Sequence, residues 1–197
     1  MKIYNDNNNV NTVITKGIDC EKGLMHYEIV IPINEALLAK LNKDMGYLVD
    51  KYGVLQTAVR PYLSIIQFEA FEHFEGLFSK WVQRICGMHE GFDLAINNYG
   101  ITPVGDMYYR IQNPFELDKF FNSFSVVNNY LKDSGLSSAQ FEYQPKLMIA
   151  GHVQSINAML EFSAKEIHEI LSVNQLWLIR KPVGRPAEKM NVFSLNP

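Results

Sequence analysis

Cysteine is scarce in this chain of 197 residues, which contains only Cys20 and Cys86. The two thiols form no Cys-x-x-Cys pair, so the sequence predicts neither a disulfide framework nor a zinc site. Its five histidines are scattered and match no His-Glu-x-x-His or other metal-ligand spacing. We therefore expect reduced thiols, no metal ion and no cofactor, and reduced thiols are typical of a cytoplasmic protein.

Positive charge and long apolar runs are also lacking. The 18 Lys and Arg residues are outnumbered by 21 Asp and Glu residues, for a formal net charge of −3 and a pI near 6.0. General DNA binding and binding to anionic membranes both need a large positive field, so neither partner is expected. No apolar run approaches the roughly 18 residues of a membrane span, and the first residues lack the apolar centre of a secretion signal.

The composition that remains is that of a folded domain, with 47% apolar and 20% charged residues. Residues 1–16 are rich in Asn and poor in large apolar side chains, so we expect a tail there and one domain over residues 17–197. Apolar periodicity then predicts the elements. They are strands over 24–33, 62–70, 92–101, 107–112 and 147–153, helices over 35–50, 71–85, 114–131 and 156–171, and a hairpin of strands over 175–181 and 190–195.

Asn34 is suited to cap the first helix, and Gly53 to end it. Strands outnumber helices and several are joined as hairpins, which favours an α+β class over a doubly wound parallel sheet. The chain also divides into two halves with a similar order of elements, which indicates two lobes that meet near residues 101–106.

Two strand-like segments that begin with proline occupy matching places in these halves. The first is Pro61-Tyr62-Leu63-Ser64-Ile65-Ile66-Gln67-Phe68, and the second is Pro145-Lys146-Leu147-Met148-Ile149-Ala150-Gly151-His152. Side chains alternate across a strand, so Tyr62, Ser64, Ile66 and Phe68 should share one face, and Lys146 and Met148 should share another.

This arrangement resembles the two-histidine phosphoesterases, which include the 2′-5′ RNA ligase-like proteins and cyclic phosphodiesterases, over residues 24–196. In that superfamily each segment carries His-x-Thr or His-x-Ser, and the two histidines face each other across a cleft. Here Tyr62 and Lys146 occupy the histidine positions, while Ser64 and Met148 occupy the hydroxyl positions. The resemblance implies a bilobal, pseudo-symmetric fold in which two mainly antiparallel sheets flank a central groove, with the helices outside.

The replaced histidines predict altered chemistry. The family reaction needs one imidazole as base and one as acid, and imidazole suits both tasks because its pKa is about 6.5. Tyrosine and lysine have ordinary pKa values of about 10 and about 10.4, so neither is a ready base at neutral pH. Lys146 and Ser64 can still hold a phosphate through charge and a hydroxyl hydrogen bond.

We therefore assign no catalytic residue and predict a ligand-binding set in the groove. Tyr109 enters this set as a surface on which a base could stack, and Arg180 as part of a basic segment with Lys181, Arg185 and Lys189. Packing is the alternative role for Tyr62 and Tyr109, and solvation for Lys146 and the basic segment. The set is Tyr62, Ser64, Lys146, Met148, Tyr109 and Arg180.

Three functions are compatible with these residues. The first is a catalytically degenerate protein of the 2′-5′ RNA ligase-like fold that binds a phosphorylated small molecule, a nucleotide or an RNA end. The second is an active phosphodiesterase, such as an RNA 2′,3′-cyclic phosphodiesterase, with altered catalytic groups. The third is a non-enzymatic scaffold for protein interactions.

Overall fold

The computed structural model describes residues 23–56, 59–182 and 186–197. The predicted tail of residues 1–16 lies outside these ranges, as do Cys20 and Arg185. In chain order the elements are β1 (Leu24–Pro32), α1 (Glu35–Tyr52), β2 (Tyr62–Phe71), the 3-10 turn η1 (Glu72–Phe74), α2 (Glu75–Cys86), β3 (Phe92–Ile101), β4 (Met107–Ile111), α3 (Glu116–Ser123), α4 (Ser125–Asp133), β5 (Gln140–Phe141), β6 (Lys146–Ala150), α5 (Ile156–Ser163), β7 (His168–Val173), β8 (Gln175–Lys181) and β9 (Glu188–Ser194).

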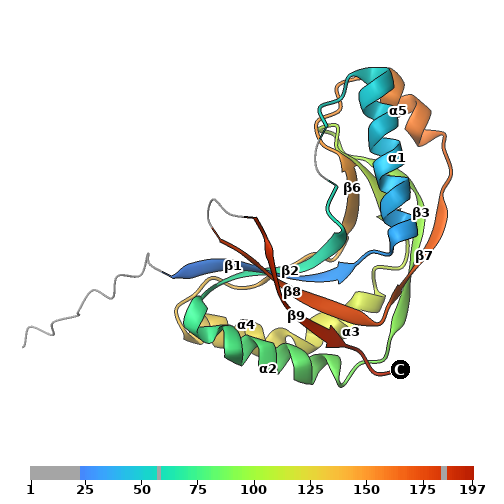
Figure 1. The fold of residues 1–197 in the computed structure, drawn as a ribbon. Helices are drawn as coiled ribbons and strands as arrows, with labels where there is room; N and C mark the ends of the chain where they lie inside the picture. The colour runs from blue at the N-terminus through green and yellow to red at the C-terminus, as the bar shows by residue number, and fades with distance from the viewer. Residues whose placement is uncertain (1–22, 57–58, 183–185) are drawn as a thin grey trace, which may run out of the picture.

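The strands form two sheets in which every neighbouring pair is antiparallel. One sheet has the order β5-β2-β1-β8-β9 and the other has the order β6-β4-β3-β7. Figure 1 shows α1 and α5 beside the four-stranded sheet, and α2, α3 and α4 beside the five-stranded sheet. The predicted α+β class with two antiparallel sheets and outer helices is therefore confirmed.

The two lobes are not consecutive halves of the chain. The expected boundary near residues 101–106 falls between β3 and β4, which pair with each other in the same sheet. The last two strands, β8 and β9, return to the sheet that β1 and β2 began. The order of helices and strands in each half can be predicted from local sequence patterns. The sheet to which a strand belongs depends instead on pairing between segments that are far apart in the sequence.

Local signals set both ends of α1 as predicted. Asn34 Oδ1 accepts a hydrogen bond of 2.8 Å from the backbone N–H of Leu37, which satisfies one of the unpaired donors of the first turn. At the other end Gly53 adopts a left-handed conformation with φ of 64°, and its N–H donates to the carbonyl of Val49. A side chain at Gly53 would strain that conformation.

The prediction of one helix over residues 156–171 is wrong. Helix α5 ends at Ser163, and residues from His168 onward form β7, which pairs with β3 along its whole length. Within β7, Leu171 and Val173 are buried while the residues between and before them are not. Six alternating residues are too few to be predicted as a strand when a helical pattern precedes them. They form a strand because they pair with β3.

Two smaller differences follow the same principle. The helix predicted from Pro114 is two helices, α3 and α4, which meet at Phe124. The two-residue strand β5 was not foreseen, because its pairing with Ile66 and Gln67 of β2 is a long-range contact. No helix within the described residues is long and apolar enough to cross a membrane.

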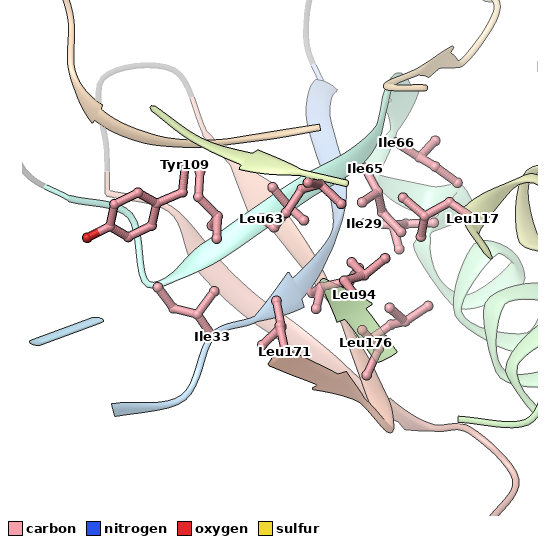
Figure 2. Close-up of a cluster of buried hydrophobic side chains, with 14 of the residues drawn as sticks. Ile29, Ile33, Leu63, Ile65, Ile66, Leu94, Tyr109, Leu117, Leu171 and Leu176 are labelled. Carbon is pink, nitrogen blue, oxygen red and sulfur yellow. The ribbon is translucent and has the colours of Figure 1, made fainter. Parts of the chain in front are cut away.

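Both sheets share one apolar core. Figure 2 shows Ile29 and Leu63 of the five-stranded sheet in the same cluster as Leu94 and Leu171 of the four-stranded sheet. Helix α1, which follows the first strand of the five-stranded sheet, packs against β6 of the other. The core therefore joins the two lobes instead of leaving them as separate units.

A carboxylate fastens α1 to the four-stranded sheet. The hydroxyls of Tyr99 on β3 and Tyr109 on β4 both donate to Asp44 Oδ2, at 2.8 and 2.7 Å. Burial and the Asp44 carboxylate raise the pKa of both phenols, so both remain donors at neutral pH. Hydrogen bonds to a charged acceptor are stronger than neutral ones, so this contact fixes the position of α1 on the sheet.

We expect Asp44→Ala to lower the free energy of unfolding by about 2–4 kcal/mol, because two largely buried hydroxyls lose a charged acceptor. Urea denaturation measures this change. Asn42→Ala, at an exposed position of the same helix, is the control and should cost no more than about 0.5 kcal/mol. Equal effects of the two substitutions would contradict an anchoring role for Asp44.

A second polar cluster joins α1 to α5. The hydroxyl of Tyr47 donates to Glu161 Oε1 at 2.6 Å, and Lys51 Nζ donates to Oε2 at 2.7 Å. The hydroxyl of Tyr52 also donates to Glu161 Oε2. The Lys51 ammonium, and after it the two hydroxyls, hold the pKa of the Glu161 carboxyl well below its usual range.

Because the pKa of Glu161 is lowered in the folded protein, we predict that Glu161→Gln makes the free energy of unfolding depend less on pH in the acid range. The Glu161 carboxylate contributes fully above the pKa of the unfolded chain, about 4.3, and its contribution is lost progressively as the pH falls toward the lower folded pKa. The difference in unfolding free energy between wild type and Glu161→Gln, from urea denaturation, should therefore shrink between neutral pH and about pH 3. A difference that does not change with pH would rule out this linkage.

Candidate ligand-binding site

Strand β2 of one sheet contacts β6 of the other, and side chains from both line one pocket with a volume of about 470 Å³. Tyr62 and Ser64 line it from β2, and Lys146 and Met148 line it from β6. The structure thus brings together the two proline-led segments, together with four of the residues predicted to contact a ligand.

Alternation along β2 is interrupted at Ile65. The register of β1 against β2 shifts there, pairing Ile29 with Ile66 and Val30 with Ser64, so Ile65 is an extra residue. Ile66 is consequently buried, and Gln67 lines the pocket in its place. The prediction that Ile66 shares a face with Ser64 is wrong for this reason, because a bulge cannot be read from alternation alone.

Gln67 also determines how the Ser64 hydroxyl is used. Gln67 Nε2 donates to Ser64 Oγ at 3.3 Å. The Ser64 oxygen is therefore an acceptor within the protein, and its own proton remains available to a molecule in the pocket.

Tyr62 is a neutral phenol in this setting. Burial raises its pKa, and the carboxylate of Glu28 raises it further, against a smaller opposite effect of the Arg60 guanidinium. At neutral pH Tyr62 therefore keeps its proton and can donate it in a hydrogen bond.

Arg60, which sequence analysis missed, lines the same pocket just before β2. Its Nη1 lies 4.0 Å from Oε1 of Glu28, a carboxylate whose side chain is 2% exposed, whereas the Arg60 side chain is 61% exposed. Glu28 also pairs with Lys181 and lies 3.5 Å from Nε2 of His26. The position of Arg60 directly before Pro61 is the signal that could have revealed it.

Lys146 and Met148 project from β6 beside an aromatic ring of the neighbouring strand. Lys146 Nζ lies 5.3 Å from the centroid of the Tyr108 ring, within the range of a cation–π contact. That ring lies directly over Gly100 of β3, where any Cβ would overlap it. Glycine at this position therefore allows Tyr108 to lie flat against the sheet next to Lys146.

Tyr109 and Arg180 do not line this pocket. Tyr109 is fully buried on the opposite face of its sheet, where it binds Asp44 as described above. Arg180 Nη1 lies 2.7 Å from Glu72 Oε1, and its Nη2 lies 2.7 Å from Glu188 Oε2. Tyr27, which pairs with Arg180 on the neighbouring strand, is in the core. The Arg180 side chain therefore forms its ion pairs on the face of the sheet that the helices cover.

Imidazole groups are missing from the lining of the pocket, as far as the structure describes the chain. His152 follows the pocket residue Gly151, but it lies beyond the end of β6 with φ of 53°, and its backbone N–H is bonded to Asp106. His89 is engaged with Ser123, at 2.8 Å between Nε2 and Oγ. Within the described ranges, no group of three His, Cys, Asp or Glu side chains is placed to hold a metal ion.

No family model and no curated protein matches the sequence of this chain. Solved structures do resemble it. E. coli LigT shares 13% identity and covers 89% of this chain and 99% of its own length, with a TM-score of 0.57. TT0787 of Thermus thermophilus shares 15% identity, covers 87% of this chain and 98% of its own, and has a TM-score of 0.62.

This chain has the LigT fold. A third structure, described as a phosphoesterase, agrees, with 14% identity, coverage of 88% and 99%, and a TM-score of 0.56. The sequence resemblance to the two-histidine phosphoesterases is thereby confirmed for the fold. LigT itself has been solved in complexes with 3′-AMP, phosphate, NADP+ and ATP.

We predict that the Tyr62 phenol ionises above its ordinary pKa of 10.0, and that Glu28→Gln brings its pKa down. The substitution removes a negative charge that disfavours the phenolate and leaves the Lys181 ammonium without its partner. Alkaline titration followed by phenolate absorbance, as the difference between each background with and without Tyr62→Phe, isolates this one tyrosine. An unchanged Tyr62 pKa in Glu28→Gln would contradict the electrostatic coupling.

Proposed function

We propose that this chain is a pseudoenzyme of the LigT fold that binds a phosphorylated small molecule, a nucleotide or an RNA end in the pocket between β2 and β6. The observation that carries the proposal is the lining of the pocket. It combines the Lys146 ammonium, the Arg60 guanidinium and the hydroxyls of Ser64 and Tyr62, without an imidazole among them. Such a set suits the binding of phosphate oxygens.

The same lining argues against catalysis. Hydrolysis of a phosphodiester needs a group that accepts a proton from the attacking oxygen and another that protonates the leaving oxygen. Tyr62 holds its proton at neutral pH because burial and Glu28 disfavour the phenolate. Lys146 is positioned as a charged donor, and Met148 offers no hydroxyl on its side of the pocket. A ligand would therefore be held but not cleaved.

The complexes of LigT with 3′-AMP, phosphate, NADP+ and ATP support this choice of ligand class, since all four carry phosphate. The proposal also agrees with the overall charge. A chain with a net charge of −3 is poorly suited to a long polyanion, but a few cations gathered in one pocket suffice for a single phosphate group. We therefore favour a small ligand or the end of a chain over general nucleic-acid binding.

Isothermal titration with 3′-AMP tests the binding part of the proposal. Wild type should bind, and Lys146→Ala should weaken binding by about tenfold or more, because one charge-assisted hydrogen bond to phosphate is lost. Lys132→Ala, an exposed lysine on α4, is the matched control and should leave binding unchanged. Equal affinities for wild type and Lys146→Ala would count against the pocket as the binding site.

Turnover of 2′,3′-cyclic AMP separates the three functions. The proposal predicts binding of phosphate compounds and no product. Hydrolysis that disappears in both Tyr62→Phe and Lys146→Ala would instead identify an active phosphodiesterase with altered groups. Neither binding nor hydrolysis would leave a protein-interaction scaffold as the remaining function.

A further inference from the structure

The polar groups around the pocket differ in the strength of their contacts within the protein. Of the lysine and arginine side chains near Glu28, Arg60 makes the weakest contact with it. Its distance of 4.0 Å from Glu28 Oε1 is at the limit of an ion pair, and Lys181 Nζ lies closer to the same oxygen. With a side chain that is 61% exposed, Arg60 can turn toward a ligand at little cost, since Lys181 continues to balance the buried carboxylate.

The remaining groups in the pocket also present protons. Ser64 accepts from Gln67 and so has its own proton free for a ligand oxygen. Tyr62 is half-buried beside a carboxylate and keeps its proton. Lys146 lies at the surface of β6 with its ammonium toward the same space. Donors therefore reach the pocket from both of its walls.

The carboxylate of Glu142 also lines the pocket, but it does not cancel the positive charge there. Glu142 is exposed, and its Oε1 accepts from the backbone N–H of Gln144 at 3.3 Å, within its own loop. An exposed carboxylate is screened by water, and it contributes far less to the local field than a charge in direct contact with a ligand. Arg60 and Lys146 give the pocket a positive character that the chain as a whole does not have.

We propose that the pocket selects a terminal phosphate monoester over a phosphodiester, and that Arg60 is the second cationic ligand of that phosphate, together with Lys146. This inference rests on the proposed function, because it specifies which phosphate compound occupies the same pocket. A monoester presents three terminal oxygens and carries close to two negative charges at neutral pH, whereas a diester presents two free oxygens and one charge. Four donor groups, two of them cationic, match the monoester better.

Competing nucleotides that differ only at the phosphate test the proposal. Affinities for 3′-AMP, 2′,3′-cyclic AMP and adenosine are measured by isothermal titration at neutral pH. Wild type should prefer 3′-AMP over the cyclic diester by about tenfold or more. Arg60→Gln should reduce this preference to about threefold or less, while the affinity for the diester changes little.

The controls separate failure of this inference from failure of the proposed function. Arg84→Gln, at an exposed position on α2, should retain the full preference. Arg60 is largely exposed, so Arg60→Gln should unfold with an unchanged urea midpoint, which excludes a general loss of structure. Equal affinity for monoester and diester, with both still weakened by Lys146→Ala, would overturn the selectivity and leave the proposed function intact. No binding of either nucleotide to wild type would overturn both.

Discussion

The packing of α1 against β6, together with the shared apolar core, fixes the spacing between the two walls of the pocket. Helix α1 follows β1 of the five-stranded sheet but buries its apolar side against the four-stranded sheet. Asp44 then fastens it there through two tyrosine hydroxyls. The chain is interlaced a second time when β8 and β9 return to the first sheet. The pocket therefore lies between two sheets that share one apolar core and are joined by α1, and this arrangement places β2 opposite β6.

Within that frame, strand pleating decides which groups meet. Period-two alternation directs Tyr62 and Ser64 from one side and Lys146 and Met148 from the other into the same space. The bulge at Ile65 then turns Gln67 toward the pocket, where it orients the Ser64 hydroxyl. The result is a LigT fold in which hydroxyl groups and two cations line the pocket. The fold and its chemistry are separable, because the sheets are held by the core and not by the residues that line the cleft.

The buried carboxylate of Glu28 lies close to groups that also affect the pocket. Glu28 is almost fully buried, which is costly for a carboxylate unless cations surround it. Lys181 supplies that charge, and Arg60 lies farther away, at the 4.0 Å limit of an ion pair. Burial raises the pKa of Tyr62 and the Glu28 carboxylate raises it further, while Glu28 lies 4.0 Å from the Arg60 guanidinium that lines the pocket. One buried charge thus links the stability of the five-stranded sheet to the electrostatics of the site.

Sequence patterns were enough to predict most elements and four of the residues that line the pocket. Asn34 and Gly53 mark the ends of α1 because caps depend on a few neighbouring residues. The resemblance to the two-histidine phosphoesterases pointed to Tyr62, Ser64, Lys146 and Met148, and alternation predicted which of them share a face. Such patterns could not predict long-range pairing. Because of that pairing, residues 168–173 form a strand, and β3 and β4 lie in one sheet instead of in two lobes. Tyr109 is buried on the face of its sheet away from the pocket. Gln67 reaches the pocket because of the bulge at Ile65, and Arg180 lies outside it because of its ion pairs. Both effects depend on partners distant in the chain. Contacts of that kind have no local signature, so they become visible once the chain has folded.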